Sequence, residues 1–430
     1  MNKTNFSTVL VGFYTRLLLL LIVLSLFLQT ALSSAGLPVY LDELLMVNAL
    51  ACLAVKSWTD KTAKAFFKIY ILSFFLLIVL SINSIGVRSY FSILFQIFIH
   101  LKFIVFFSFL FVFFQGERAK SLVLFFLVVS LVFMFLNIFT GSLFNAFFDK
   151  PLQLRGGFAR PIGIQGDTAS LGTTLAIAAS FYICHKENIQ IKAKLLLMFL
   201  FTVLILLSSV RTALIVLPLI FLWWFKDSFK TFLLATFFLV VAAFSFKSSN
   251  YVDELVEITV QNVEWTVENP VESAYIRGIM IFFSFEVANT HFPLGAGAAM
   301  YGTVMSDDSP IYTEIGLQDS RFFIEKDGIY DSNFASLLGE FGYLGLLIYL
   351  ILFYKVITLP ERLGVAKLSS EFKFVFFLLI LGYSIATPIF MNTYPAFWLS
   401  LIAVAAYLPV KKTIKEPVQH NKLIASEHNQ

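Results

Sequence analysis

Arginines are scarce charged residues in a sequence dominated by apolar ones, and their guanidinium groups are well suited to binding phosphate. The planar guanidinium donates two parallel hydrogen bonds to a phosphate or carboxylate group. In the segment RGGFARPIGIQGDTAS, Arg155 and Arg160 lie in a turn rich in glycine and proline, and an apolar run opens near Asp167. A helix that begins there would place its free N–H groups beside both guanidiniums, which favours a diphosphate-binding site. An ordinary turn whose arginines meet lipid phosphates is the alternative interpretation.

Arg211 lies at the tip of a second candidate site, within the segment SSVRT. Residues 195–225 would have to cross a membrane twice, whereas each full span needs about 20 residues. The tip is therefore expected to lie below the membrane surface, where an arginine is costly unless it faces water or an anion. This predicts a recessed cationic pocket. The alternative is an arginine that extends to lipid headgroups beside two tilted helices.

Arg277 lies on a helix that the sequence predicts over residues 270–289. Asn269 and Pro270 are typical of a helix start, and Glu272 can reach back to the cap. The middle of the helix is strongly apolar, which indicates a position in or against the membrane interface. There Arg277 could join the same cationic pocket, or it could remain in solvent on a packed amphipathic helix.

The elements that carry these arginines belong to a chain suited to a lipid environment. Hydrophobic residues account for 59% of the sequence and charged residues for 13%, and the mean hydropathy is +0.84. A soluble protein of this length cannot bury that much apolar surface, and long continuous apolar runs argue against a β-barrel. We therefore expect an all-α, polytopic membrane protein with about 12 transmembrane helices, at residues 17–34, 37–55, 66–85, 89–114, 121–140, 168–185, 195–210, 212–225, 231–246, 337–356, 372–390 and 394–410.

Lysine and arginine are unevenly distributed between the two sides of this predicted topology. With both termini in the cytoplasm, the inner segments hold most of these residues, in agreement with the positive-inside rule. The net charge of +4 therefore reflects membrane orientation and does not indicate nucleic-acid binding. The sequence predicts four regions. Residues 1–246 hold transmembrane helices and a short outer loop at 141–167, and residues 247–340 form a large outer loop. Further spans follow in residues 341–410, and residues 411–430 form a cytoplasmic tail.

Acidic residues are concentrated in the predicted large loop. Their spacing fits no cage for a divalent ion, so a solvated acidic surface is favoured and no metal site is predicted. The residues considered for such a site are Asp307, Asp308, Glu314 and Asp319.

Two ionisable residues, His100 and Lys102, lie in the middle of the predicted span 89–114. A lysine is costly at that depth, so Lys102 is expected to face the interior of the bundle. Asp42 or Glu43 is a potential partner, although nothing in the sequence pairs either of them with the lysine.

The order of several motifs resembles that in the superfamily of O-antigen polymerases and O-antigen ligases, bacterial inner-membrane proteins of about a dozen helices with one large periplasmic loop. Arg155 and Gly166 are similar to the Arg-x10-Gly pattern of the polymerases, and SSVRTALIVLP is similar to the family's short segment between two spans. PLGAGAAMYG and DSNFASLLGEFGYLGLL resemble the closing stretch before the next span.

The resemblance favours a polymerase over a ligase. Ligases of this superfamily typically carry a functional histidine where the closing stretch begins, but here residues 331–333 read DSN, and His291 lies upstream. One departure concerns the second outer loop, where Arg277 is followed by Ala288 in place of the glycine that the polymerase pattern would have.

The resemblance implies a GT-C-like glycosyltransferase that works by inverting, metal-independent transfer and needs no cofactor. It would move a growing glycan from undecaprenyl diphosphate onto another lipid-linked repeat unit at the periplasmic face, in the biosynthesis of O-antigen or a related surface polysaccharide. Its expected partners are these lipid-linked oligosaccharides, membrane lipids and a chain-length regulator, without nucleic acid. The diphosphate-binding residues would be Arg155, Arg160, Arg211 and Arg277, and the candidate bases would be Asp331, Glu340 and Asp167.

Two alternatives remain open at this point. Glu340 and Asp167 could serve only as caps for the helices that follow them. The protein could also be a ligase that attaches the glycan to lipid A core, or a flippase or transporter of lipid-linked oligosaccharides. A transporter would show internal symmetry, paired broken helices or several charged residues at mid-membrane, and only His100 and Lys102 are of this kind in the sequence.

Overall fold

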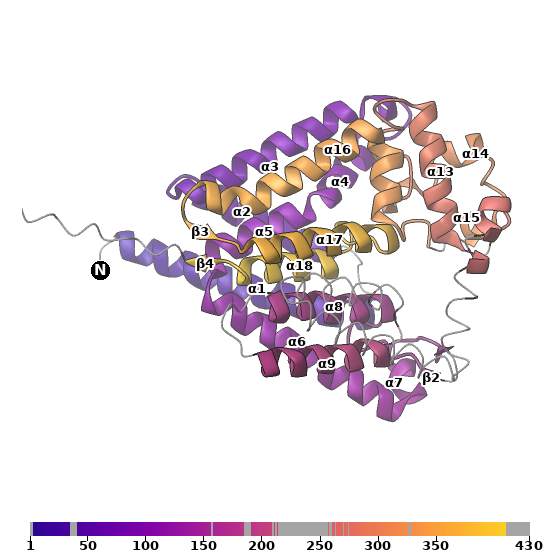
Figure 1. The fold of residues 1–430 in the computed structure, drawn as a ribbon. Coiled ribbons are helices and arrows are strands. Elements are labelled where there is room, and N and C mark those ends of the chain that lie inside the picture. Colours follow the sequence, from indigo (N-terminus) through magenta and orange to yellow (C-terminus); the bar gives the residue numbers. More distant parts are fainter. Residues whose placement is uncertain are drawn as a thin grey trace, which may run out of the picture.

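The computed structural model is a bundle of α-helices with two short antiparallel strand pairs, which confirms the predicted all-α class (Figure 1). It describes residues 3–34, 41–155, 158–184, 191–208, 210, 213, 257, 260–262, 264–269, 271–273, 275–325 and 328–409. The main helices of the bundle are α1 (Lys3–Ser34), α2 (Leu41–Lys56), α3 (Lys61–Leu80), α4 (Tyr90–His100), α5 (Lys102–Phe114), α6 (Glu117–Thr140), α8 (Thr168–Cys184), α9 (Ile191–Ser208), α16 (Asn333–Arg362), α17 (Ser370–Ala386) and α18 (Thr393–Ala405).

Smaller elements connect these helices. The helices among them are α7 (Ser142–Phe147), α13 (Ile276–Thr290), α14 (Ile311–Glu314) and α15 (Arg321–Glu325), with short 3-10 turns at Ile82–Ser84 and Val304–Ser306. The strand pairs are β1 (Leu154–Arg155) with β2 (Phe158–Ala159), and β3 (Ala366–Lys367) with β4 (Leu408–Pro409).

Several helices are apolar enough to cross a membrane. Within the described residues, α3, α6 and α16 have both the length and the hydropathy of a span, and α4 with α5 forms a fourth candidate that is bent by 48°. The apolar helices α8 and α18, and the apolar parts of α1 and α9, are shorter. These helices fit a membrane protein, but they support three or four spans where the sequence predicts twelve. The predicted spans 212–225 and 231–246 lie outside the described residues.

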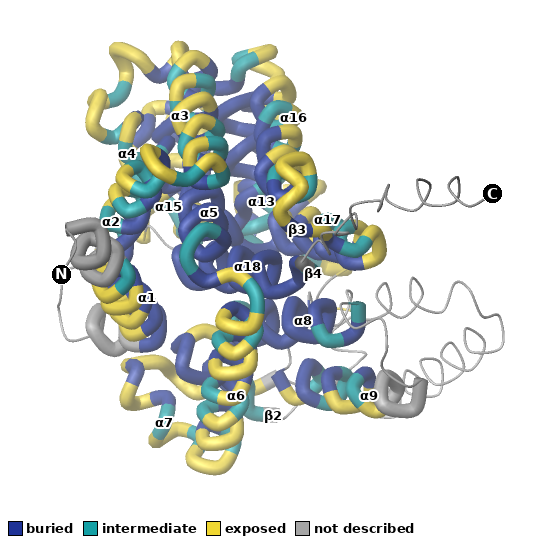
Figure 2. The backbone as a smooth tube through the Cα atoms, turned by 90° about the vertical axis from the view of Figure 1, so that its left-hand side faces the viewer, coloured by how far each residue is buried: buried dark blue, intermediate teal, exposed yellow. Residues whose placement is uncertain are grey.

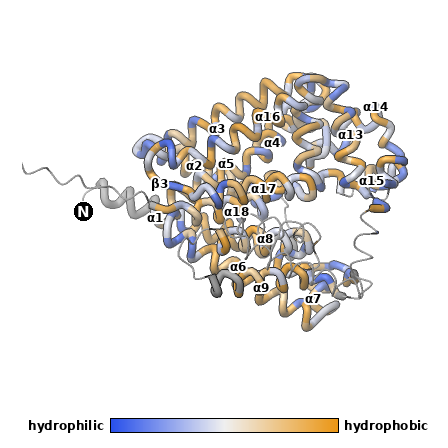
Figure 3. The backbone as a smooth tube through the Cα atoms, in the orientation of Figure 1, coloured by the Kyte–Doolittle hydropathy of each residue, from blue (hydrophilic) through white to orange (hydrophobic). Residues whose placement is uncertain are grey.

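The core and the outer surface of the bundle are both apolar. The central helices α5, α8 and α18 are almost entirely buried (Figure 2). The outer helices are hydrophobic along much of their length (Figure 3), and they expose large apolar side chains. Leu72 and Phe75 of α3 and Phe139 of α6 are 61%, 60% and 82% exposed. Exposed apolar surface of this extent is unfavourable in water and is expected where lipid surrounds the protein.

The connecting elements are not evenly distributed around the bundle. The β1–β2 hairpin and α7 lie at the same end of the bundle as α13, α14 and α15, while the β3–β4 pair lies at the opposite end (Figure 1). The described segment with Arg155, Arg160 and Asp167 and the helix α13, which carries Arg277, therefore lie at the same end of the helices.

A break in α16 receives part of the large loop. Gly342 has a φ of 62° inside this helix, so the carbonyl groups before it lose their helical partners. The backbone N–H of Ala296 donates to the carbonyl of Gly339 at 2.9 Å, and that of Gly297 donates to the carbonyl of Glu340 at 2.6 Å. These two hydrogen bonds come from a segment, residues 293–308, that we name the docking loop.

The docking loop also contacts the turn between α3 and α4. Asn83 donates from its amide to the carbonyl of Gly295 at 2.7 Å, and the hydroxyl of Ser81 accepts from the N–H of Ala298. The two motifs PLGAGAAMYG and DSNFASLLGEFGYLGLL are thus in direct contact, although they are separated in the sequence.

Two predicted boundaries in the large loop are wrong. The helix expected over 270–289 is α13, which begins at Ile276, because the hydroxyl of Ser273 accepts from the N–H of Tyr275 and stabilises a turn before it. The helix expected from residue 337 is α16, which begins at Asn333, where the hydroxyl of Ser332 caps it by accepting from the N–H of Ala335. The predicted boundary between loop and span at residue 340 therefore lies within a helix.

Substitution of Gly342 tests the contact between the docking loop and α16. In Gly342→Ala, the added Cβ would lie 2.4 Å from the carbonyl oxygen of Pro293, in a backbone conformation (φ 62°, ψ −170°) that costs an alanine about 1–3 kcal/mol. Overlap with the backbone adds about 1–3 kcal/mol. We expect a clearly lower midpoint of thermal unfolding in detergent. Gly382→Ala in α17, whose Cβ would meet no atom within 4 Å, is the control and should not be destabilised. Equal midpoints for the two variants would contradict the docking.

Candidate functional site

A buried hydrogen bond between a histidine and a carboxyl group joins α4 to α16 at the place where both helices are interrupted. Nε2 of His100 lies 2.7 Å from Oε2 of Glu340, and neither side chain has any exposed surface. His100 is the last residue of α4, directly before the bend at Leu101, and Glu340 lies just before the break at Gly342. A buried carboxylate without a partner costs several kcal/mol, so this contact ties the two breaks together.

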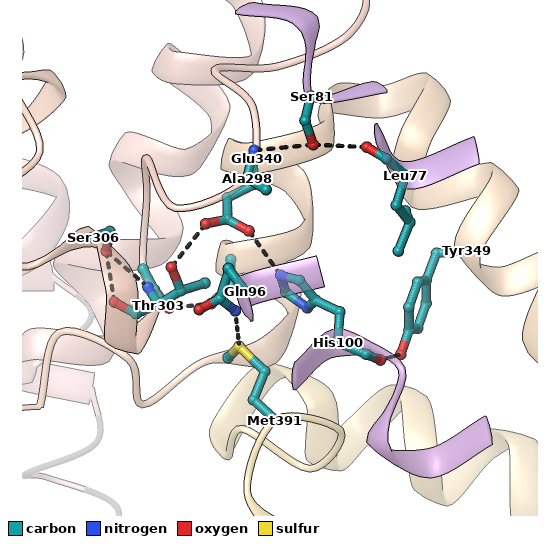
Figure 4. A network of polar contacts seen from close by, with 12 residues as sticks. Leu77, Ser81, Gln96, His100, Ala298, Thr303, Ser306, Glu340, Tyr349 and Met391 are labelled. Carbon is teal, nitrogen blue, oxygen red and sulfur yellow. Dashed lines mark hydrogen bonds and ion pairs between the residues drawn. The ribbon is translucent and has the colours of Figure 1, made fainter. Parts of the chain in front are cut away.

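The docking loop supplies the second partner of Glu340 (Figure 4). The hydroxyl of Thr303 donates to Oε1 of Glu340 at 2.7 Å, and the hydroxyl of Ser306 donates to the carbonyl of Thr303. Ser306 also shares a hydrogen bond of 2.7 Å with the hydroxyl of Tyr312. Burial raises the pKa of Tyr312 above its usual range, so this phenol stays protonated and available as a donor.

Several buried polar atoms in this cluster have no hydrogen-bond partner among the described residues. They are Nδ1 of His100, Oε1 of Gln96 and Nδ2 of Asn333, and all three side chains belong to residues with no exposed surface. An unpaired buried N–H or C=O group costs about 1–3 kcal/mol. A buried charge without a counter-ion costs more than this. Leaving a neutral polar atom unpaired is therefore a smaller penalty in this cluster than leaving a charge unpaired.

A second buried charge cluster lies on the other side of the bend. Nζ of Lys102 is 2.6 Å from Oε1 of Glu43 and 3.4 Å from Oδ2 of Asp42, and it donates to the hydroxyl of Thr393 at 2.8 Å. The partners that the sequence suggested for Lys102 are confirmed. The carboxylates lie in the first turn of α2, and Lys102 and Thr393 are the first residues of α5 and α18. Three helix N-termini meet here, and their partial positive charges help to stabilise two carboxylates against one lysine.

Arg277 and Asp331 form a partly exposed ion pair. Nη2 of Arg277, in the first turn of α13, lies 3.1 Å from Oδ2 of Asp331, which immediately precedes the cap of α16. The two side chains are 30% and 34% exposed, so solvent or a ligand can reach both. Packing of α13 on α16 and the docking loop holds the pair, with a hydrogen bond of 2.6 Å from the hydroxyl of Tyr301 to the carbonyl of Met280.

Arg160 and Asp167 lie at the N-terminus of α8. Arg160 donates from Nη1 to Oε1 of Gln153 at 2.9 Å and from Nη2 to the hydroxyl of Thr168 at 2.8 Å. Oδ2 of Asp167 accepts from the N–H of Ser170 at 2.7 Å, so this carboxylate caps the helix, as one of the two interpretations of the sequence expected. The cap places a negative charge beside the helix N-terminus, which reduces its attraction for an anion.

The turn between Arg160 and Asp167 is anchored in the bundle. Nε2 of Gln165 donates to the hydroxyl of Tyr394 at 2.7 Å and to that of Ser130 at 2.9 Å, which connects the turn to α18 and α6. Ile162 donates from its backbone N–H to the side chain of Asn137 at 2.6 Å. The position of Arg160 is therefore set by buried polar contacts.

The predicted site residues fall into three places. Arg160 and Asp167 lie at the start of α8, Arg277 and Asp331 lie between α13 and α16, and Glu340 is buried against His100. The contacts described above join residues within each place and do not connect one place to another. Arg155 lies in β1 and pairs with Phe158 across the hairpin, but its side chain and all of Arg211 lie outside the described residues.

Two structural findings could not be anticipated from the sequence. Glu340 does not cap α16, because it lies inside that helix and is hydrogen-bonded to His100, which is far away along the chain. Thr303, Ser306 and Tyr312 carry no sequence signal beyond their position after the PLGAGAAMYG motif. Within the acidic part of the loop, Asp308 forms an ion pair with Arg88, and no group of potential metal ligands occurs in the described part of the chain.

Removal of the Thr303 hydroxyl tests the buried cluster. In Thr303→Val, Oε1 of Glu340 loses its donor at unchanged side-chain size, and we expect a loss of about 1–3 kcal/mol in the free energy of unfolding. The measurement is chemical unfolding in mixed micelles. Thr313→Val, at an exposed position of α14, is the matched control and should change the free energy by no more than about 0.5 kcal/mol. A Thr303→Val protein as stable as the control would show that Glu340 is not held by this hydroxyl.

The geometry thus defines a buried junction around Glu340 and His100 and a partly exposed pair of Arg277 and Asp331 at the start of the same helix. No protein-family model matches the chain, and no curated protein matches it.

Proposed function

We propose that the protein is a membrane glycosyltransferase that lengthens a lipid-linked polysaccharide. It would transfer a growing glycan from polyprenyl diphosphate to the sugar end of another carrier-linked repeat unit. The apolar helices fit an enzyme that takes lipid-linked substrates, and the gathering of both arginine-bearing segments at one end of the bundle fits a reaction on one side of a membrane. In this proposal that side is the periplasmic face of a bacterial inner membrane, with about 12 spans and both termini in the cytoplasm.

The observation that carries this proposal is the pair of Arg277 and Asp331. It puts a guanidinium and a carboxylate at hydrogen-bond distance, partly exposed, at the end of the bundle where the loops gather. An arriving diphosphate would compete with Asp331 for the guanidinium, because an arginine binds either anion with the same donor geometry. Binding of the donor would then free Asp331 to act as a base.

The proposed reaction needs one base and one group that stabilises negative charge. Asp331 accepts the proton of the acceptor hydroxyl, whose oxygen forms a bond to the anomeric carbon of the donor glycan. The bond from that carbon to the diphosphate oxygen breaks on the opposite face, and its electron pair leaves with the diphosphate. Arg277 stabilises the negative charge of the leaving group, assisted in this proposal by Arg155, Arg160 and Arg211.

Two other assignments of the candidate bases are less favoured. Asp167 is already engaged as the cap of α8, and Glu340 is buried and bonded to His100 and Thr303. A base must reach the acceptor hydroxyl, and of the three carboxylates only Asp331 is both partly exposed and paired with a cation that can bind the leaving group.

A flippase or transporter of lipid-linked oligosaccharides is the second candidate, and one observation favours it. The helices α4–α5 and α16 are both broken beside buried ionisable side chains. Broken helices with charged groups at their ends are typical of transporters that bind substrates within the membrane. The sequence alone indicated no such pair of breaks.

One assay separates these functions. Purified protein in proteoliposomes receives carrier-linked repeat units, and both their length and their transfer across the bilayer are measured. The proposed polymerase lengthens the units, whereas units that cross without lengthening would support the flippase and refute the enzyme. A deletion strain separates polymerase from ligase: loss of a polymerase leaves lipid A core with one repeat unit, and loss of a ligase leaves bare core.

Variants of the Arg277–Asp331 pair test the mechanism in the same assay. Asp331→Asn should slow lengthening by about 10²–10⁴-fold, and Arg277→Lys by about 10²-fold, because a point charge does not reproduce the guanidinium fork. Arg155→Ala and Arg211→Ala should also lose long chains at normal protein levels, with poor rescue by lysine. The control is the exposed pair of α15 in the same loop, as Arg321→Lys and Glu325→Gln, which should keep the full rate. Full-length polymer from Arg277→Lys and Asp331→Asn would exclude the proposed roles.

A further inference from the structure

The pair of His100 and Glu340 has a feature that glycosyl transfer does not require. Both side chains are completely buried, and the pair lies where two membrane-type helices are broken. An ionisable group at such a place in a membrane protein commonly binds or relays a proton. The hydrogen bonds around the pair limit the number of protons that it can hold.

The hydrogen-bond pattern limits the pair to a few states. If only Nε2 of His100 carries a proton and donates to an ionised Glu340, the pair has a net charge of −1 in a buried place. If Nδ1 also carries a proton, or if Glu340 is protonated and Nδ1 keeps the proton of the neutral ring, the pair has no net charge. Oε1 of Glu340 already accepts from the hydroxyl of Thr303, so a proton on Glu340 would lie on Oε2 and bond to Nε2 of His100. With the proton there, both uncharged states place a hydrogen on Nδ1, and only the charged state leaves Nδ1 bare.

The surroundings favour the uncharged states. Oε1 of Glu340 receives one neutral hydroxyl, from Thr303, and no cation other than His100 contacts the carboxylate among the described residues. The nearby Lys102 is already bound to two carboxylates. An Nδ1–H group without a hydrogen-bond partner costs less than an uncompensated negative charge on the buried pair.

In the described part of the chain, no titratable group that faces the pair or its partners supplies a positive charge that is not already paired. The neighbours from the docking loop and α14 are phenols and a carboxyl group, and the tyrosine of α16 donates to the carbonyl of His100 at 2.7 Å. The groups that face the pair or its partners, from all packed elements, are Tyr301, Asp307 and Tyr312 of the loop and α14, Tyr349 of α16, Lys102 of α5, and Asp42 and Glu43 of α2. Lys102 is the one cation in this set, and it already pairs with two carboxylates, those of Asp42 and Glu43.

We propose that His100 and Glu340 form a proton-binding site in the interior of the protein, occupied by one proton beyond the single N–H that their hydrogen bond requires. The extra proton keeps the broken ends of α4 and α16 together without a net buried charge. The site is independent of the proposed glycosyl transfer, and it would serve either an enzyme or a transporter.

Nitrogen NMR of histidine tests the site directly. The chain has five histidines, so ¹⁵N-histidine protein in lipid nanodiscs gives few signals, and the signals missing from His100→Gln identify His100. At pH 7 we expect Nδ1 of His100 to be protonated in the full-length protein. A bare Nδ1 with a protonated Nε2 at pH 7 overturns the proposal, and this result needs no variant that alters the pair.

A substitution of Glu340 adds a second criterion. In Glu340→Gln the negative charge is gone, so the pair needs no extra proton. We expect His100 to be a neutral imidazole at pH 7, with one N–H, either on Nε2 donating to the amide oxygen or on Nδ1 with Nε2 accepting from the amide nitrogen. The matched control is Glu361→Gln on the same helix, whose partner is Lys373, and it should leave the His100 signals unchanged. A His100 that remains protonated on both ring nitrogens in a folded Glu340→Gln protein would show that Glu340 does not hold the extra proton, and would also overturn the proposal.

Discussion

The buried contact between Glu340 and His100 is the interaction on which the arrangement of the site depends. A carboxylate inside an apolar bundle is tolerated only when it is paired, and here the partner comes from a helix far away in the sequence. The pairing fixes the end of α4 against the break in α16. The break in turn exposes the backbone carbonyls that receive the docking loop. One polar contact therefore connects two helices and the loop that follows α13.

The docking of the loop has a consequence for the exposed pair of Arg277 and Asp331. The loop and α16 form, with α13, a second apolar core that includes Met280, Tyr301 and Ala335. Because α13 and the start of α16 are both packed in this core, Arg277 and Asp331 are held opposite one another at the end of the bundle. A rigid scaffold with a partly exposed cation and carboxylate is the kind of arrangement that a transferase needs to position a diphosphate and a base.

Much of the architecture can be predicted from the sequence because it depends on local composition. The apolar runs predict helices, and the cost of a buried lysine predicts that Lys102 has a carboxylate partner, which is Glu43 with Asp42 nearby. The capping role of Asp167 is also one of the two interpretations that the sequence allows. Boundaries are less predictable, because a single side-chain contact such as Ser273 with Tyr275 moves the start of α13. The pairing of His100 with Glu340 is not predictable from one sequence, because no local pattern relates residues on two distant helices.

A double-mutant cycle on His100 and Glu340 tests the central claim most directly. The free energy of unfolding is measured in mixed micelles for the original protein, His100→Phe, Glu340→Leu and the double variant. Each single variant leaves one buried polar group without its partner and should lose about 3–5 kcal/mol. The double variant should lose at least about 2 kcal/mol less than the sum of the two single losses. Additive losses, within about 0.5 kcal/mol, would mean that the two side chains do not interact and that something else holds the loop and the broken helices together.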